Sequence, residues 1–232
     1  MADKPAVDYV DSWMLAPEQL ASLYDDVLNP SFPVDELMPR DGLLRRLARQ
    51  DSGVCCRAAV DAAGRVLAAI VADTYSRVLL LSYLAVLPEF RDRGVGSGLA
   101  RDAVPRWIAR YRPALVVAEV EDPRGPADSD VGHGDAAARM RLYEGLGGLI
   151  LPVPYVQPAL SERAERVRNL LLMVFYASTE RIGADLLVGF LTDYFTVCEG
   201  STPVDAEFTG LIAACRRTDG VPLLKPSEYL SA

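Results

Sequence analysis

A short glycine-rich segment with two arginines is the part of the sequence whose residue types point most directly to chemistry. Glycines let the main chain approach an anion closely and adopt dihedral angles closed to other residues. Backbone amides and the dipole at the start of a helix favour a phosphate. The segment therefore predicts a pyrophosphate-binding loop with added positive charge. It lies between an apolar run and a segment of helical spacing and comprises Arg91, Asp92, Arg93, Gly94, Val95, Gly96, Ser97 and Gly98.

The spacing of these glycines separates the loop from two common nucleotide-binding patterns. A dinucleotide fold needs G-x-G-x-x-G after an early strand, whereas these glycines stand at positions 94, 96 and 98. The Walker pattern needs Lys followed by Ser or Thr after the glycines, but the only lysines of the chain are Lys4 and Lys225. A nucleotidyl or phosphoryl transferase also needs a metal-carboxylate cluster, which the sequence does not show.

Two glutamates near the end of a predicted strand are candidates for proton transfer. Glu119 and Glu121 are two residues apart, so on a strand they point to the same face and could accept a proton through water. Equally, this strand end could simply meet solvent. His133, the only histidine, is either a base or a bystander in a glycine-flanked loop. A single histidine and four cysteines without C-x-x-C spacing argue against a metal site.

The elements around the loop predict the centre of a sheet. The apolar run Val78–Leu87 suits a strand buried on both faces, and it should be the central strand. Ser97–Tyr111 has helical spacing, with Pro105 expected to kink or divide the helix. Pro113–Val120 is the next strand, so the strand, helix, strand order implies a parallel pair.

The rest of the chain predicts further helices and antiparallel strands, with two amphipathic helices beyond Ser178. The fold class is therefore α/β (α+β): a mixed, largely antiparallel central sheet with flanking helices and a helical C-terminal extension. The predicted helices are Pro17–Val27, Asp41–Leu47 with an aspartate cap, 135–144 with Asp135 as its cap, Ala184–Cys198 and Asp205–Cys215. The predicted strands are a hairpin within Cys55–Ile70, then Leu149–Val153 and Asn169–Tyr176.

Two motifs, one on each side of a predicted strand, occur in an order found in a known superfamily. The first, from Arg91 to Gly96, fits R/Q-x-x-G-x-G/A and follows an apolar strand. The second, from Arg141 to Gly147, places a tyrosine on a helix before a glycine turn. Together they resemble the GNAT superfamily of N-acyltransferases. The resemblance covers roughly residues 10 to 177, so we expect an acyltransferase domain over 1–177 with the helical extension 178–232 packed on it.

The resemblance implies a cosubstrate, acetyl-CoA, and a set of residues that hold it. In this superfamily the fourth and fifth strands splay apart, so the parallel pair here should do the same and admit the pantetheine arm. That arm would bond to the backbone of Leu84, Ala85 and Val86, while the amides of 93–98 hold the pyrophosphate. Tyr143 would be the general acid that protonates the departing thiolate, unless it is a helix tyrosine packed in the core.

The resemblance also implies direct acetyl transfer to a primary amine of a small molecule or a protein. The acceptor site commonly lies in the region of Phe32, Asp35 and Glu36, although a hydrophobic staple explains these residues equally well. Tyr155 and Gln157 belong to a stretch longer than the minimal family pattern and could contact the acceptor. A different class of function, a non-catalytic acyl-CoA-binding or sensing module, also fits the motifs.

Composition narrows the partners and the compartment. The 232 residues carry 24 basic and 32 acidic side chains, a net charge of −8, which argues against nucleic acid and suits a cationic amine. No apolar run approaches the roughly 20 residues that cross a bilayer, and the N-terminus lacks a secretory pattern. We therefore expect a cytoplasmic enzyme without a membrane partner. The apolar stripes of the C-terminal helices could cap the site or form a homodimer surface.

Overall fold

The computed structural model describes residues 5–125 and 136–231, which form two compact units. The N-terminal unit contains the residues up to Thr74 together with Leu81–Arg112. The C-terminal unit contains Tyr75–Leu80 and the chain from Pro113 onward. The glycine-rich loop belongs to the first unit, whereas Glu119, Glu121 and Tyr143 belong to the second.

The N-terminal unit is a small sheet covered on both faces. Its strands are β1 (Asp8–Asp11), β2 (Val54–Val60), β3 (Val66–Tyr75) and β4 (Val78–Val86), the last two reaching into the other unit. β2 pairs antiparallel with both β1 and β3, and all of its residues are buried. The predicted hairpin is confirmed, and adjacent Cys55 and Cys56 are both buried free thiols. β1 was not predicted.

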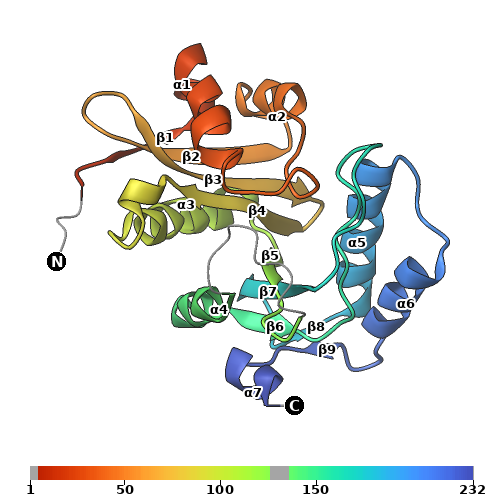
Figure 1. Cartoon of the computed structure of the whole chain (residues 1–232). Helices are drawn as coiled ribbons and strands as arrows, with labels where there is room; N and C mark the ends of the chain where they lie inside the picture. Colours follow the sequence, from red (N-terminus) through yellow and green to blue (C-terminus); the bar gives the residue numbers. More distant parts are fainter. Residues whose placement is uncertain (1–4, 126–135, 232) are drawn as a thin grey trace. The chain divides into compact units, whose positions relative to one another are not determined.

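Helices cover the two faces of this sheet (Figure 1). On one face lie α1 (Pro17–Ser22), its continuation as the π-helix η2 (Leu23–Leu28), and α2 (Arg40–Leu47). The 3-10 turn η1 (Ser12–Met14) precedes them in the chain. The cap predicted for α2 is wrong: Pro39 occupies the N-cap, and Asp41 lies in the first turn. Pro39 has an extended conformation with φ of −53° and ψ of 137°, so the helix begins directly after it, at Arg40.

The other face carries α3 (Val95–Tyr111), which follows the 3-10 turn η3 (Pro88–Phe90). The expected division of α3 at Pro105 is wrong, because the helix is continuous. Its buried side repeats every four residues at Val95, Leu99, Ala103 and Trp107. Pro105 stands on the exposed side, where water can satisfy the carbonyl that proline leaves without a donor, and the packed side keeps the helix in one piece.

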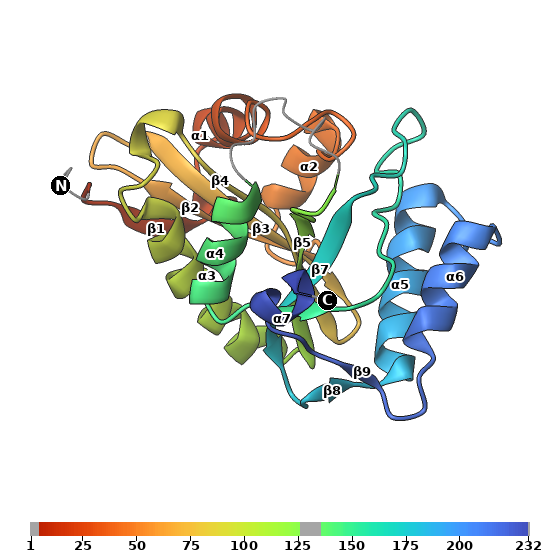
Figure 2. The same cartoon turned by 60° about the horizontal axis from the view of Figure 1, so that its bottom comes forward.

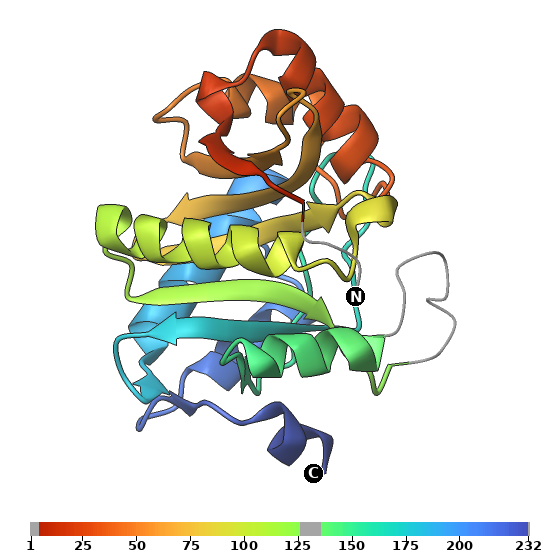
Figure 3. The same ribbon diagram turned by 90° about the vertical axis from the view of Figure 1, so that its left-hand side faces the viewer.

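The C-terminal unit is built on β5 (Leu115–Glu121) and β7 (Leu170–Ala177), which run side by side in opposite directions (Figure 3). β6 (Leu149–Leu151) pairs antiparallel with the other edge of β7. α4 (Ala136–Gly145) precedes β6, and α7 (Pro226–Leu230) contacts both of them. A second, two-stranded sheet joins β8 (Arg181–Ile182) to β9 (Val221–Pro222).

The two predicted C-terminal helices are present as α5 (Ala184–Glu199) and α6 (Ala206–Cys215), side by side (Figure 2). Their apolar side chains share one hydrophobic core with β5 and β7. This core includes Leu115, Val117, Leu172, Val174, Leu187, Phe190, Phe195, Phe208 and Leu211. The extension therefore completes the core beneath the strand that carries Glu119. The boundary after residue 177 stays a prediction.

The strands follow the order β1-β2-β3-β4-β5-β7-β6 in one mixed, mostly antiparallel sheet with a parallel pair. The predicted fold class and the central position of β4 are confirmed. Over the described ranges, none of the helices combines the length and the hydropathy that a bilayer crossing requires.

Candidate functional site

The glycine-rich loop turns sharply before the first turn of α3. Gly94 is the N-cap of the helix and has a left-handed conformation with φ of 73°, which a glycine adopts without strain. The amide of Gly98 donates to the carbonyl of Gly94 at 3.0 Å. The three amides between them, of Val95, Gly96 and Ser97, therefore precede the first intrahelical bond. Amides in this position suit an anion.

Close packing joins the loop to the end of β4. A Cβ added to Gly96 would lie 2.9 Å from Cγ2 of Val86, so only glycine lets α3 start this close to the strand. The Nε of Arg91 donates to the carbonyl oxygen of Val86 at 3.2 Å. Arg91 therefore bonds to the backbone of a residue predicted to hold pantetheine. The neighbouring Ala85 is buried, and Leu84 is half-buried.

Arg93 adds positive charge beside the loop. Its guanidinium carbon lies 5.7 Å from the ring centroid of Phe90, and that of Arg65 lies 5.5 Å from the same ring. Arg65 also forms an ion pair with Glu89. Cation–π contacts of this kind orient a guanidinium without neutralising it. Of these two arginines, Arg93 is the one that belongs to the predicted loop.

The C-terminal unit places Glu119 in a cluster of polar and aromatic side chains. Its carboxylate accepts hydrogen bonds from the Tyr155 hydroxyl, from Nε2 of Gln157 at 2.8 Å and from the Tyr194 hydroxyl at 3.2 and 3.4 Å. Burial, followed by the nearby Glu119 charge, raises the pKa of both phenols well above the ordinary value. The tyrosines therefore remain protonated donors at neutral pH.

One hydrogen-bond acceptor in this cluster lacks a donor among the described residues. Gln157 is 5% exposed, and among the described residues its side-chain Oε1 has no hydrogen-bond partner. Tyr75 and Phe190 line the cluster, with ring centroids 5.1 and 5.9 Å from that of Tyr194. A buried oxygen without a donor costs free energy unless a ligand or water supplies one. The cluster can thus receive an N–H group beside a carboxylate.

Glu121 has a different environment from Glu119. It forms an ion pair with Arg139 of α4. The strand alternation still places both glutamates on one face, as predicted. Among the contacts described, the Glu119 carboxylate accepts bonds from three neutral side chains, whereas the Glu121 carboxylate pairs with a guanidinium.

Tyr143 lies on α4, where its ring packs edge-on against Phe175 with centroids 5.9 Å apart. Burial raises the pKa of its phenol, with the Arg139 charge acting in the opposite direction. Its backbone carbonyl accepts from the amides of Leu146 at 3.1 Å and Gly148 at 2.9 Å. The glycine turn expected after the tyrosine is confirmed. A half-buried phenol of raised pKa fits both the core interpretation and the general-acid interpretation.

Three further candidates have separate outcomes. Phe32 packs against Tyr83 with ring centroids 5.1 Å apart, which favours its packing interpretation. Asp35 and Glu36 lie in the turn region that follows Phe32. His133 lies outside the described residues. Over 5–125 and 136–231, no group of three His, Cys, Asp or Glu side chains is placed to hold a metal ion.

Sequence reasoning missed that Tyr155, Gln157 and Tyr194 all bind Glu119. The first two were expected near the acceptor, but not on this carboxylate. Tyr194 stands 75 residues away in the sequence and reads as part of the apolar stripe of α5. Its hydroxyl gave no separate signal, because a buried tyrosine and a core phenylalanine share one helical pattern.

Comparison with known families covers the loop and the two glutamates. The acetyltransferase (GNAT) family model matches residues 20–127. Residues 20–127 form a GNAT acetyltransferase domain. The chain is thus an acyltransferase enzyme, and the resemblance inferred from its motifs is confirmed. Tyr143 and the cluster partners of Glu119 lie beyond the matched stretch.

Solved GNAT structures share the fold at low identity. A GNAT-family protein from Bacteroides thetaiotaomicron is 18% identical, with a TM-score of 0.52 over 70% of this chain and 82% of its own. NAA60 from Arabidopsis thaliana, in complex with a bisubstrate analogue, is 13% identical with a TM-score of 0.52 over 75% and 99%. The spermidine/spermine N-acetyltransferase SpeG from Vibrio cholerae is 14% identical with a TM-score of 0.50 over 72% and 91%. No curated protein sequence matches the chain. These likenesses establish the fold alone.

Proposed function

We propose that this GNAT enzyme is an acetyl-CoA-dependent N-acetyltransferase that transfers the acetyl group directly to a primary amine of a small molecule or a protein. The observation that carries the proposal is the left-handed Gly94 directly before α3, followed by a Gly96 too close to β4 for any side chain. Together they present the amides of a helix start on a strand end, as a diphosphate requires.

In this proposal the loop holds the coenzyme. The amides of 93–98 bind the pyrophosphate, and Arg91 and Arg93 add positive charge. The backbone of Leu84, Ala85 and Val86 bonds to the pantetheine arm. The bond from Arg91 to the Val86 carbonyl supports this role, because it fixes the backbone at the end of β4.

The acceptor must lose a proton before its nitrogen can attack the thioester. We assign this step to Glu119, with Glu121 as the second candidate. Glu119 is favoured because the unpartnered Oε1 of Gln157 belongs to the same amide that bonds its carboxylate, so two acceptors are available to one ammonium. Glu121 instead forms an ion pair with Arg139, so an amine would have to compete with that guanidinium for its carboxylate.

Tyr143 is assigned to the opposite proton transfer. The neutral amine nitrogen bonds to the carbonyl carbon, the carbon–sulfur bond breaks, and the departing thiolate takes the phenolic proton of Tyr143. The nitrogen, now bonded to the acetyl group, releases one further proton to solvent and becomes the amide. A pKa raised by burial keeps this phenol protonated at neutral pH, so it is ready to donate. The phenolate then regains a proton from solvent.

The test is release of free thiol from acetyl-CoA by the purified protein with a panel of amines and peptides bearing amino groups. Tyr143→Phe should lower kcat by about 100-fold or more, with the KM for acetyl-CoA little changed, because general acid catalysis contributes about 100- to 10,000-fold. Tyr111→Phe, at an exposed tyrosine at the end of α3, is the matched control. A wild type without turnover rejects the proposed function, and undiminished turnover by Tyr143→Phe rejects the acid role.

The same assay separates the two glutamates. We expect Glu119→Gln to lower kcat/KM for the amine more than Glu121→Gln does, and the loss should diminish at high pH, where the free amine is already deprotonated. The reverse order of effects would assign the base to Glu121.

A further inference from the structure

Residues 152–169 form an excursion between β6 and β7 that lies alongside α5 (Figures 1 and 2). We call it the strap. Its two legs are joined by paired backbone bonds: the Gln157 amide donates to Val167 at 2.9 Å, and the Val167 amide donates to Gln157 at 3.2 Å. This pair lies where the strap delivers Tyr155 and Gln157 to Glu119.

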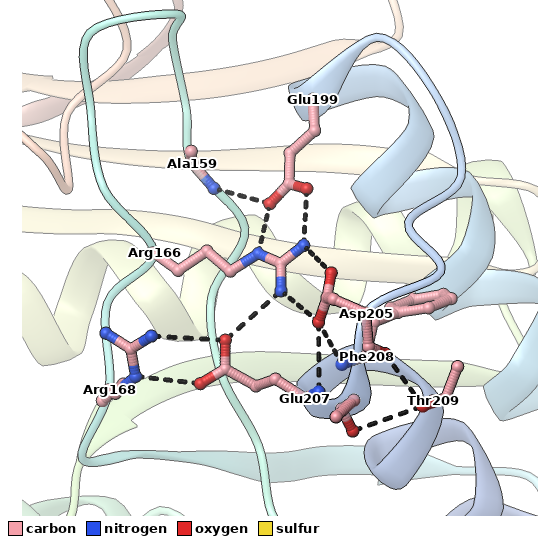
Figure 4. A network of polar contacts seen from close by, with 9 residues as sticks. Ala159, Arg166, Arg168, Glu199, Asp205, Glu207, Phe208 and Thr209 are labelled. Atoms are coloured by element: carbon pink, nitrogen blue, oxygen red, sulfur yellow. Dashed lines mark hydrogen bonds and ion pairs between the residues drawn. The ribbon is translucent and has the colours of Figure 1, made fainter.

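One arginine fastens the strap to both C-terminal helices (Figure 4). Arg166 donates to both carboxylate oxygens of Glu199, at 2.7 Å each, and to both of Asp205, at 2.9 and 2.8 Å. A further bond reaches Glu207 at 3.2 Å. The Arg166 side chain is 15% exposed, and its guanidinium carbon lies 5.3 Å from the Phe195 ring centroid. Bidentate bonds between a largely buried guanidinium and carboxylates hold both partners in a fixed geometry. We call these contacts of Arg166 with Glu199, Asp205 and Glu207 the clamp.

Glu199 holds both legs of the strap at once. Its Oε1 accepts from Arg166 on the returning leg and from the amide of Ala159 on the outgoing leg, the latter at 3.2 Å. Ala159 is two residues from Gln157, and Arg166 is adjacent to Val167. The clamp therefore lies next to the backbone pair that fixes Gln157, and a continuous series of short contacts runs from Glu199 to Glu119.

We propose that Arg166 is a positioning residue for acetyl transfer, because its clamp on the strap holds Tyr155 and Gln157 against Glu119. The inference rests on the proposed function, in which Glu119 and Gln157 receive the amine. Outside its paired residues the strap has little regular structure, and besides the clamp only the burial of side chains such as Tyr155 and Val156 holds its outgoing leg in place. A shift of about 1 Å at a catalytic group can cost about 100-fold in rate.

A purely structural role predicts a different pattern of kinetics. If the clamp only stabilises α5 and α6, its loss lowers the melting temperature and leaves kcat and KM of the folded enzyme unchanged. If Arg166 positions the strap, its loss acts on the acceptor and spares the coenzyme, whose proposed loop belongs to the other unit. Arg168 offers a matched control, because it belongs to the same strap and its side chain is 63% exposed. Of the three carboxylates in the clamp, it bonds only to Glu207.

The experiment compares Arg166→Gln, Arg166→Lys, Glu199→Gln and Arg168→Gln in the full-length enzyme with the amine that it acetylates best. We expect Arg166→Gln and Glu199→Gln to lower kcat/KM for the amine at least about tenfold, with KM for acetyl-CoA within about twofold of the wild type. Arg166→Lys should recover part of the loss, and Arg168→Gln should match the wild type. Hydrogen exchange at the Gln157 and Val167 amides should rise in the first two variants.

Two outcomes reject the inference in distinguishable ways. A folded Arg166→Gln protein with amine kcat/KM within twofold of an active wild type overturns it and leaves the proposed function standing. If that variant does not fold, Glu199→Gln, which keeps an acceptor for Ala159, decides by the same criterion. A wild type that acetylates no amine overturns the proposed function, and the inference falls with it.

Discussion

Two successive glycines set the position of Tyr143. Gly147 has a φ of 86°, and a Cβ on Gly148 would lie 2.5 Å from Sδ of Met173 and 2.9 Å from the carbonyl oxygen of Tyr143 itself. The carbonyl cannot move without breaking the bonds that end α4. The glycine turn therefore fixes both the end of the helix and the backbone of the proposed acid.

This crowding gives a prediction for Gly148→Ala. We expect it to lower the free energy of unfolding by about 1 to 3 kcal/mol, as overpacking does, and to lower kcat because the Tyr143 backbone must shift. Gly145→Ala is the control, since its Cβ would meet nothing within 4 Å. Urea denaturation and thiol release measure the two effects. A Gly148→Ala protein as stable and as active as Gly145→Ala would contradict the argument.

At the scale of single residues, spacing in the sequence singled out the loop and Tyr143 as candidates, because both patterns depend on neighbours a few residues away. It also drew Glu119 and Glu121 from strand alternation. It could not find the donors of Glu119, which come from the strap and from α5. Those contacts depend on how remote elements pack, and no local pattern encodes them.

Secondary-structure elements followed the sequence where one face was clearly apolar. α5 and α6 begin and end within one residue of the predicted limits, and Asp205 caps α6 as a capping residue should. β1 was missed because it has only four residues, two of them aspartates. Pro105 misled because helix-breaking propensity is local, whereas the packed face of α3 is a tertiary feature.

The cap of α6 also gives a pH prediction. The cap residue is Asp205, whose carboxylate accepts hydrogen bonds from Arg166 and from the Phe208 amide. These bonds, the one from Arg166 most strongly, hold the pKa of Asp205 below its ordinary value. A lowered pKa stabilises the folded state above the unfolded value, near 3.8, and the stabilisation is lost as pH falls further. Asp205→Asn keeps the cap but removes the charge, so it should be less stable than the wild type by below about 1 kcal/mol at pH 7.

The difference in unfolding free energy between the wild type and Asp205→Asn should become smaller below about pH 4, where the wild-type carboxylate takes up a proton. Denaturant midpoints at pH 7 and pH 3 measure it. Asp205→Ala, which loses the cap too, should show an added loss that does not depend on pH. An equal gap between wild type and Asp205→Asn at both pH values would remove the ion pair from the explanation.

For the molecule as a whole, two motifs in order were enough to predict the GNAT fold, which the family match and the sheet order confirm. Charge and composition supplied only exclusions. The acceptor could not be predicted, because many chemistries share one fold and the pocket decides between them. The core that β5 and β7 share with the C-terminal helices could not be predicted either, because an apolar helix face does not indicate which element it packs against.

Binding of the coenzyme should be visible in global stability. At 100 times its dissociation constant, acetyl-CoA should add about 2.7 kcal/mol and raise the melting temperature by about 5 to 10 °C. Gly96→Val should abolish the shift, because its side chain would collide with Val86. Gly42→Ala, where a Cβ meets nothing within 4 Å, should keep it. An equal shift with ATP, or a normal shift for Gly96→Val, would contradict coenzyme binding at this loop.

The core that α5 and α6 share with β5 and β7 also bears on the order of events during synthesis. The strand with Glu119 emerges from the ribosome well before Phe190, Phe195 and Phe208, the side chains that cover it. Domains fold as units while the chain is made, so the apolar face of this strand stays exposed until α5 and α6 have been synthesised. A stop codon before α5 would therefore yield an insoluble fragment rather than a smaller enzyme.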